Sequence, residues 1–422
     1  MQEDQNLTKT HKVIIVSLFK DSNRLTAEKH LNELQRLVHT LGGEVIEKVV
    51  QFKKHIDAKY YIGKGKLIQL YNFCKDVKCD YIVFNNDITP SHMKNIQSFF
   101  DKKVLIKDRV GVILDIFAKH ARTKESKTQI KLAKLEYLLP RLTRQWTHLE
   151  RQMGGIGTRG GPGETQIEID RRLIRNQIIK LKKDLKKISK TRDTQKSNRK
   201  NIYKVSLVGY TNAGKSTIMQ SLSSKKTYIK DELFATLDTS TKKITIDKSN
   251  NFLISDTVGF IRNLPDNLIA SFRSTLSEII DSNLLLKVID ASSEEYLNHI
   301  NSIDSVLEYL NILSKQFIIV FNKIDLIKNN NILVKLKKEY PSAVFVQSTK
   351  KDNMKLILKE VKRKMNHNFI IETIKLPYEK YFLIDDIYKK FAVLKREDNK
   401  KNVFLKLSGE REKLNNLIKL IN

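Results

Sequence analysis

The chain has 422 residues and carries 78 Lys and Arg residues against 47 Asp and Glu residues, a formal charge of +31. This length allows two or three domains with separate cores. The sequence has no apolar run long enough for a transmembrane helix, and its polar first twelve residues argue against a signal peptide. The charge excess favours a polyanionic partner, nucleic acid or an anionic membrane, over the codon bias of a Lys-rich and Asn-rich composition.

Residues 1–123 predict a small, mostly parallel α/β domain. The apolar residues 12–19 predict a buried strand, and residues 27–41 predict an amphipathic helix. Further strands are expected at 44–52, around 81–84 and around 104–106, with helices between them. The only cysteines, Cys74 and Cys79, suit neither a disulfide framework nor a zinc site, so we expect a reducing cytosol.

Residues 124–195 predict a long antiparallel helical hairpin. The pattern is helical from about 127 to 153, with Pro140 as a kink or break, and again from 166 to about 192. The second helix carries a coiled-coil seam that Arg171 interrupts. The seam consists of Ile167, Ile174, Ile178, Leu181, Leu185 and Ile188. The Gly-rich residues 154–164 form the tip, about 35–40 Å from the base at 1.5 Å per residue, and residues 186–200 predict a basic linker.

Residues 201–368 predict a nucleotide-binding domain with a phosphate-binding loop. An apolar strand at 205–208 runs straight into Gly209, and a helix is expected from Ser216 onward. Between them, backbone amides converge on the phosphates, and the helix N-terminus adds a positive dipole. We expect Lys215 to reach the β- and γ-phosphates and the hydroxyl of Ser216 to bind Mg²⁺.

A second loop follows the predicted strand at 252–254. Asp256 is positioned there to hold Mg²⁺ through a water molecule, and the amide of Gly259 is expected to sense the γ-phosphate. Between the two loops, Thr236 is the candidate for the mobile hydroxyl that also binds Mg²⁺. We therefore assign catalytic roles to Lys215, Thr236 and Gly259.

The base-binding side chains follow another apolar strand at 317–321. The carboxylate of Asp325 can accept hydrogen bonds from N1–H and the exocyclic amine of guanine, whereas adenine would present a lone pair to it. Lys323 can lay its aliphatic stem over the base. The nucleotide-contacting residues are thus expected to be Gly209, Tyr210, Thr211, Asn212, Ala213, Gly214, Lys215, Ser216, Thr217, Phe234, Ala235, Thr236, Leu237, Asp238, Asp256, Thr257, Val258, Gly259, Asn322, Lys323, Ile324, Asp325, Ser348, Thr349 and Lys350.

Phe260 stands where many such enzymes place a water-orienting Gln. A phenyl ring cannot polarise water, so we expect slow intrinsic hydrolysis of GTP. We expect the missing water-orienting group to come from elsewhere in this chain or from a partner. Arg262 and Arg273 are candidates for that group, although a surface charge is the simpler interpretation of both.

Residues 369–422 predict a small α+β domain with a hairpin at 391–395 and 403–407 and a last helix.

Taken together, these strings resemble the HflX-type GTPases over nearly the whole chain. The specific strings are residues 61–66, 115–122, 129–140, 148–151, 154–166, 209–217 and 256–262. The resemblance implies a cytosolic, Mg²⁺-dependent GTPase that binds the large ribosomal subunit and separates or rescues stalled ribosomes. It also implies that the helical hairpin reaches ribosomal RNA in the peptidyl-transferase region.

The chain departs from the family pattern at three places. Thr239 and Ser240 stand after the segment 234–238, where the family usually has a Pro. Thr349 replaces an Ala after Ser348, and the tip loop has Thr158 in place of an apolar residue and Gly160-Gly161 in place of one Gly. Because no functional side chain is removed, these changes put affinity in doubt more than activity.

The hairpin also has the chemistry for RNA. A tip of Gly, Thr158 and Arg159 can approach a phosphate backbone closely. Basic side chains on the flanks complete the expected RNA contacts: Arg151, Arg171, Arg172 and Arg175. Trp146 can stack on a base or pack against the neighbouring helix.

Two other functions compete with the ribosome-acting GTPase. A signalling GTPase would use the hairpin as a docking arm for a protein, and its charge for anionic lipids at a membrane surface. An RNA chaperone or helicase-like ATPase is the third alternative, which Asp325 argues against. We expect a monomer, because the nucleotide site needs no second copy.

Overall fold

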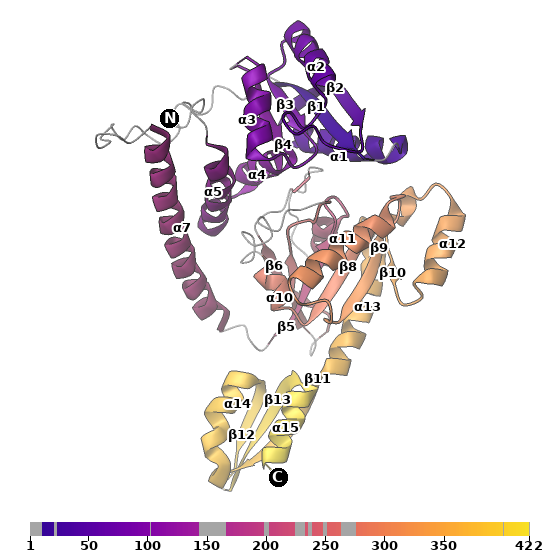
Figure 1. Ribbon diagram of the computed structural model, residues 1–422. Coiled ribbons are helices and arrows are strands. Elements are labelled where there is room, and N and C mark those ends of the chain that lie inside the picture. Colours follow the sequence, from indigo (N-terminus) through magenta and orange to yellow (C-terminus); the bar gives the residue numbers. More distant parts are fainter. Residues whose placement is uncertain are drawn as a thin grey trace. The chain divides into compact units, whose positions relative to one another are not determined.

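The computed structural model describes residues 11–20, 23–101, 103–142, 166–197, 202–223, 233–234, 239–247, 251–262, 276–399 and 401–421. Packing divides the chain into two compact units. The first comprises Met1–Lys187, Glu232–Leu237 and Leu264–Phe272, and the second comprises Ile188–Asp231, Asp238–Asn263 and Arg273–Asn422. Both are mixed α/β structures, which confirms the expected fold class (Figure 1). The boundaries of the four domains inferred from the sequence stay a prediction.

The first unit begins with a parallel sheet in the order β2-β1-β3-β4. Its strands are β1 (His11–Phe19), β2 (Gly43–Phe52), β3 (Tyr81–Phe84) and β4 (Leu105–Asp108). Residues 13–16 of β1 are all buried because helices cover both faces of the sheet. The helices are α1 (Arg24–Thr40), α2 (Lys64–Val77), α3 (Pro90–Phe99) and α4 (Arg109–His120). The predicted strands and their parallel arrangement are confirmed.

Cys74 and Cys79 form a disulfide, so the expectation that their spacing does not suit a disulfide is wrong. Lys78 adopts a left-handed conformation after α2 (φ 52°), and the amide of Cys79 donates to the carbonyl of Cys74. This turn brings the two Cα atoms to 5.3 Å, within the normal range for a disulfide. The spacing of five residues gave no sign of the pairing, because it depends on the backbone conformation of Lys78.

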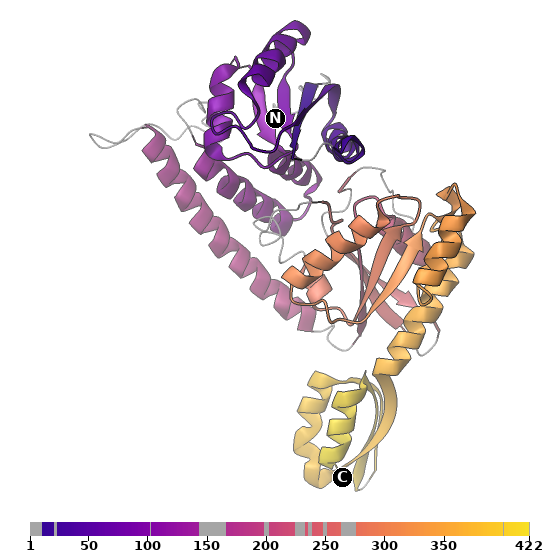
Figure 2. The same cartoon turned by 45° about the vertical axis from the view of Figure 1, so that its right-hand side comes forward.

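In the first unit, α5 (Lys124–Leu138) lies beside the part of α7 (Gln166–Ser197) that ends at Lys187, and the two helices pack through an apolar seam (Figure 2). Ile174 and Ile178 of α7 are buried against Leu132 and Leu135, as the seam predicted. A 3₁₀ turn, η1 (Leu139–Arg141), holds Pro140 and ends α5. The rest of the first predicted helix and the tip loop lie outside the described residues.

Helix α7 extends to Ser197, so most of the predicted linker at 186–200 is helical instead. The linker prediction is wrong because polarity and charge do not distinguish a linker from a solvent-exposed helix. Lys, Arg and Gln are good helix formers, and this stretch contains neither Gly nor Pro.

The second unit contains the nucleotide domain, built on a sheet in the order β10-β9-β8-β5-β7-β6. Its strands are β5 (Tyr203–Gly209), β6 (Ser240–Thr245), β7 (Asn251–Asp256), β8 (Leu284–Asp290), β9 (Phe317–Asn322) and β10 (Val344–Phe345). All neighbours are parallel except β6, which pairs antiparallel with β7. The domain's helices are α8 (Lys215–Leu222), α10 (Ser277–Ile280), α11 (Tyr296–Tyr309), α12 (Asn330–Glu339) and α13 (Lys351–Asn368).

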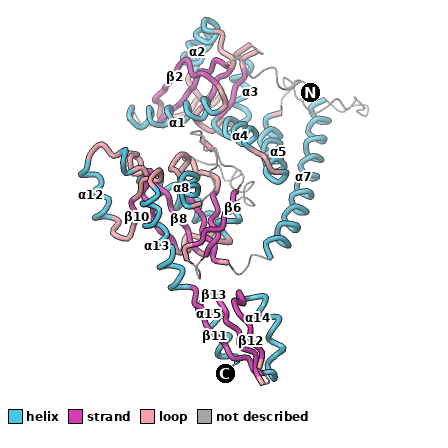
Figure 3. Tube along the Cα trace, turned by 180° about the vertical axis from the view of Figure 1, so that it is seen from behind, coloured by secondary structure: helices cyan, strands magenta, loops and turns pink. Residues whose placement is uncertain are grey.

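The last part of the chain forms a three-stranded antiparallel sheet in the order β11-β13-β12, which Figure 3 shows from behind. Its elements are β11 (Phe369–Pro377), η3 (Tyr378–Leu383), α14 (Ile384–Lys390), β12 (Ala392–Asp398), β13 (Asn402–Glu410) and α15 (Arg411–Ile421). Val403, Leu405 and Leu407 of β13 share one core with Ile387 of α14 and Leu414 of α15. The expected strand, helix, hairpin and final helix are therefore present. None of the helices in the described ranges combines the length and hydropathy that crossing a bilayer requires.

Candidate nucleotide site

Strand β5 ends at Gly209, and helix α8 starts at Lys215, as the phosphate-binding loop requires. Gly209 lies against β8, where an added Cβ would be 2.3 Å from the carbonyl oxygen of Val288. Gly214 has a φ of +92°, and an added Cβ there would be 2.1 Å from Nδ2 of Asn322. Only glycine fits either position, so the shape of this loop depends on both residues.

Lys215 is buried beneath this loop. Its Nζ donates hydrogen bonds to the carbonyl oxygens of Gly209 (3.0 Å) and Tyr210 (2.8 Å). Burial lowers the pKa of Lys215 to about 8, and the nearby carboxylate of Asp256 opposes that shift. The ammonium group is therefore held in place among carbonyl oxygens at the loop that is expected to bind phosphate.

The structure brings together two of the three predicted Mg²⁺ ligands. The hydroxyl of Ser216, at the start of α8, donates a 2.6 Å hydrogen bond to Oδ2 of Asp256, at the end of β7. Asp256 is almost completely buried. The third predicted ligand, Thr236, lies outside the described residues, as do Ala235, Leu237 and Asp238. Phe234 belongs to the first unit, where its ring contacts that of Phe117 with 4.7 Å between centroids.

The loop after β7 lies directly on the phosphate-binding loop. The amide of Phe260 donates to the carbonyl of Gly209 (3.0 Å), and the amide of Thr211 donates to the carbonyl of Phe260 (2.7 Å). An added Cβ at Gly259 would lie 2.9 Å from Cα of Thr211 and 3.0 Å from Nζ of Lys215. The loop can therefore approach this closely only because residue 259 is glycine.

Phe260 is only 2% exposed and contributes its backbone, not its side chain, to this contact. Arg262 is not the free surface charge that the simpler interpretation expected. Its guanidinium is 15% exposed and forms a 2.9 Å ion pair with Glu295. The sequence did not reveal this pairing because 33 residues separate the two side chains. Arg273, the other candidate, lies outside the described residues.

Asn322 connects two loops of the site. Its Nδ2 donates to the carbonyl of Ala213 (2.9 Å), and its Oδ1 accepts from the amide of Ser348 (3.0 Å). The side chain is completely buried. Asn322 thus holds the loop at 348–350 against the phosphate-binding loop, a role that sequence reasoning had not given it.

Lys323 and Asp325 follow Asn322 at the edge of the sheet. Lys323 has a φ of 60°, and its Nζ pairs with Asp290 at 2.8 Å. Asp290 ends β8 and was missed in the sequence, although its place at the end of an apolar strand was a usable signal. Asp325 lies exposed in η2 (Ile324–Leu326).

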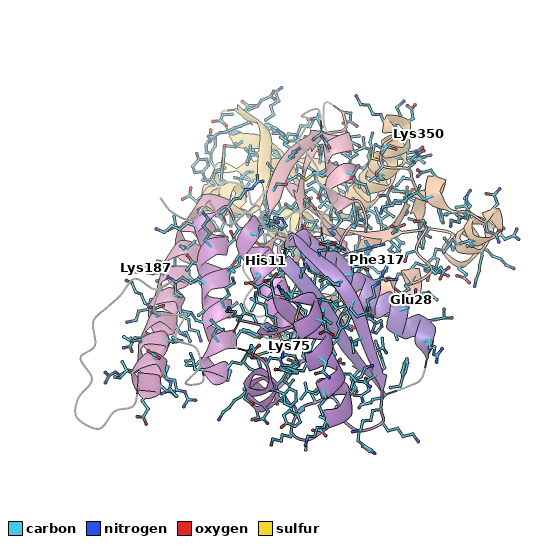
Figure 4. The ribbon with its side chains drawn as sticks, turned by 90° about the horizontal axis from the view of Figure 1, so that it is seen from above. His11, Glu28, Lys75, Lys187, Phe317 and Lys350 are labelled. Atoms are coloured by element: carbon cyan, nitrogen blue, oxygen red, sulfur yellow. A yellow bond between two sulfur atoms is a disulfide. The ribbon has the colours of Figure 1, made fainter. Side chains whose placement is uncertain are left out.

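The loop at 348–350 is only partly buried. Ser348 is buried, and its carbonyl accepts a 2.6 Å hydrogen bond from Ser221. Thr349 and Lys350 are exposed just before α13, where Figure 4 labels Lys350. The predicted nucleotide residues within the described ranges thus gather at the ends of β5, β7, β9 and β10, apart from Phe234.

Of the predicted RNA contacts, Arg171, Arg172 and Arg175 lie exposed on α7. The seam residues Ile174 and Ile178 are buried on the same helix, so the arginines occupy positions that the helix–helix contact leaves accessible. Arg151, Thr158, Arg159 and Trp146 lie outside the described residues.

Three family models match consecutive parts of the chain. They describe a "GTP-binding GTPase N-terminal" region at residues 28–118, a "GTP-binding GTPase Middle Region" at 120–199 and a "50S ribosome-binding GTPase" at 204–323. GTPase HflX of Flavobacterium psychrophilum is 41% identical over 381 residues, which cover 85% of this chain and 91% of that protein. The chain belongs to the HflX family of GTPases.

A second curated relative agrees with this membership. GTPase HflX of Escherichia coli K12 is 40% identical over 71% of this chain and 70% of its own length. Among solved structures, a complex of SsGBP with GDP is 26% identical, covers 84% of this chain and 98% of its own, and has a TM-score of 0.47. As a member of the HflX family with a phosphate-binding loop of this form, the protein binds and hydrolyses GTP.

Proposed function

We propose that this HflX-family GTPase binds the large ribosomal subunit and uses GTP binding and hydrolysis to split or rescue stalled ribosomes. The buried side chain of Phe260 is the observation that carries the proposal. A GTPase with no water-orienting side chain after Gly259 is expected to hydrolyse GTP slowly until a partner completes its site. The match of residues 204–323 to a 50S ribosome-binding GTPase model points to the large subunit as that partner.

Each part of the site has a distinct role in this proposal. The ammonium of Lys215 offsets charge on the β- and γ-phosphates, and the amide of Gly259 detects the γ-phosphate. The carboxylate of Asp325 selects guanine, and Lys323 covers the base. The neighbouring residues of both loops, together with 234–238 and 348–350, complete the contacts with the nucleotide.

The donor set fits Mg²⁺. The Ser216 hydroxyl and the Asp256 carboxylate are hard oxygen donors 2.6 Å apart, beside the phosphate-binding loop. Ser216, Thr236 and Asp256 would hold the ion, with Asp256 acting through water. When bound, Mg²⁺ neutralises charge on the β- and γ-phosphate oxygens.

We further propose that exposed arginines of the helical hairpin contact ribosomal RNA. Arg171, Arg172 and Arg175 are exposed on α7, and Arg151, Thr158 and Arg159 would extend this surface toward the tip. The formal charge of +31 suits a polyanionic partner. In this proposal the protein acts as a monomer in the cytoplasm.

The test is GTP turnover by the full chain with and without purified large ribosomal subunits. We expect stimulation by the subunits that disappears at high salt, and no competition from excess ATP. A matched series with anionic liposomes covers the alternative of a signalling GTPase at a membrane. Stimulation by liposomes but not by subunits would overturn the ribosomal proposal while leaving the GTPase activity in place.

A further inference from the structure

Tyr210 links the phosphate-binding loop to the segment that follows Gly259. Its hydroxyl accepts a 2.8 Å hydrogen bond from the backbone amide of Arg262. Its ring stacks on that of His299 in α11, with 4.1 Å between centroids and 18° between planes. Tyr210 is 7% exposed. The phenol therefore has a fixed place, set by a helix on one side and by the backbone of Arg262 on the other.

The side chain of Arg262 is anchored as well. Its guanidinium pairs with Glu295, the residue that precedes α11, at 2.9 Å. His299 and Glu295 both belong to this end of α11. One structural element thus holds Tyr210 through stacking and Arg262 through an ion pair, and Tyr210 and Arg262 hold each other.

These anchors fix the far end of the loop that contains Gly259. The near end is fixed at Asp256, the last residue of β7, which pairs with Leu207 of β5. Between the two ends, Phe260 forms a parallel bridge with Tyr210 through the hydrogen bonds to Gly209 and Thr211. The loop that carries the Gly259 amide is therefore held at three points: at Asp256, at Phe260 and at Arg262.

We propose that Tyr210 is a positioning residue for recognition of the γ-phosphate. By accepting a hydrogen bond from the amide of Arg262, its hydroxyl helps to keep Gly259 beside Nζ of Lys215, where the Gly259 amide is available to the γ-phosphate that GTP has and GDP lacks. This inference rests on the proposed role of Gly259. It predicts that loss of the hydroxyl weakens the binding of GTP but not of GDP. A general loss of packing would weaken the binding of both nucleotides.

The experiment uses the full chain with Tyr210→Phe, which removes the hydroxyl and retains the ring that stacks on His299. Affinities for fluorescent GDP and for a non-hydrolysable GTP analogue are measured, together with single-turnover GTP hydrolysis. We expect analogue affinity to fall about three- to tenfold, as for one lost hydrogen bond, with a parallel fall in hydrolysis rate and GDP affinity within about twofold of wild type. Tyr340→Phe is the matched control, since Tyr340 packs on Phe321 elsewhere in the same domain.

A coupling test separates positioning from local damage. Because Tyr210 and Glu295 both act on Arg262, the effect of Tyr210→Phe with Glu295→Ala should be smaller than the product of the single effects. Equal losses for GDP and the analogue, or no loss for either, would overturn the proposal. Gly259→Ala distinguishes a failure of the role of Tyr210 from a failure of the role of Gly259. A loss selective for the analogue in Gly259→Ala but absent in Tyr210→Phe would refute the role of Tyr210 alone, whereas no selective loss in either would refute the role of Gly259 too.

Discussion

The hydroxyl of Ser216 donates a 2.6 Å hydrogen bond to the carboxylate of Asp256, although 40 residues separate them. β5 and β7 are parallel neighbours, so the helix that begins after β5 and the last residue of β7 meet at the same edge of the sheet. This contact makes the first prediction specific. Ser216→Ala removes a predicted Mg²⁺ ligand, and we expect GTP affinity in millimolar Mg²⁺ to fall by about tenfold or more, as for a lost contact with a charged group.

The affinity of Ser216→Ala should also respond little to chelation of Mg²⁺ by EDTA, whereas wild-type affinity should fall. Ser206→Ala is the control, because Ser206 donates to the carbonyl of Glu278 away from these ligands. If EDTA weakens GTP binding by the same factor in Ser216→Ala and in wild type, Ser216 is not a ligand.

The second prediction concerns the pH dependence of stability in nucleotide-free protein. Burial lowers the pKa of Lys215 from 10.5 to about 8, against the opposing effect of Asp256. Between these values the unfolded chain binds more protons than the folded one, so the free energy of unfolding rises with pH from about 8 to 10.5. The total rise is about 3 kcal/mol, and Lys215 contributes no slope below pH 8.

Denaturant unfolding of wild type and Lys215→Met at pH 7.5 and pH 10 measures this contribution. Met has a similar shape and no charge, so the free energy of unfolding of Lys215→Met lacks the increase with pH that Lys215 contributes. The other groups titrate equally in both proteins. Parallel changes in the two proteins would show that the pKa of Lys215 is not lowered.

The third prediction concerns base selection. Asp325 lies exposed in η2, where its carboxylate is available to a purine. Asp325→Asn replaces one carboxylate acceptor with an amide donor, so GTP affinity should fall about 100-fold and xanthosine triphosphate affinity should rise. Competition against a fluorescent GTP analogue measures both. A weaker affinity for both nucleotides would indicate a damaged fold and not a changed preference.

The fourth prediction concerns Cys74 and Cys79. Their disulfide closes a loop of six residues. By lowering the chain entropy of the unfolded state, a loop of this length stabilises the folded state by about 2 kcal/mol. Reduction should therefore lower the thermal midpoint of the first unit. Thermal unfolding with and without dithiothreitol measures the difference, and Cys74→Ala/Cys79→Ala should be insensitive to the reductant. An equal response of the variant would assign the effect to something other than this bond.

The fifth prediction concerns the exposed arginines of α7. Replacing Arg171, Arg172 and Arg175 with Gln should weaken binding to large ribosomal subunits. The slope of log affinity against log salt concentration should also become shallower, because up to about three fewer counterions are released on binding. Basal GTP turnover should stay unchanged. The control replaces three lysines on the same helix with Gln: Lys180, Lys183 and Lys187. Equal losses in both triple variants would show a general effect of charge and not a contact surface at these arginines.

The backbone of the phosphate-binding loop could be predicted closely because it depends on local sequence. The glycines at 209 and 214, the lysine and the strand before them are adjacent in sequence, and the backbone conformation they require allows few other residues. The end of α7 and the disulfide were missed for the opposite reason. Polarity did not reveal helix continuation to Ser197, and a single left-handed residue, Lys78, decided the cysteine pairing.

The sequence by itself determined the α/β class, the parallel strands, the phosphate-binding loop and the resemblance to a GTPase family, because each depends on side chains or periodicities within a short window. Only the tertiary structure decided that Asn322 joins Ala213 to Ser348 and that Arg262 pairs with Glu295. Those contacts join residues on different strands and helices. Parallel pairing brings strand ends together only once the sheet has formed, and no local pattern states which side chains will meet there.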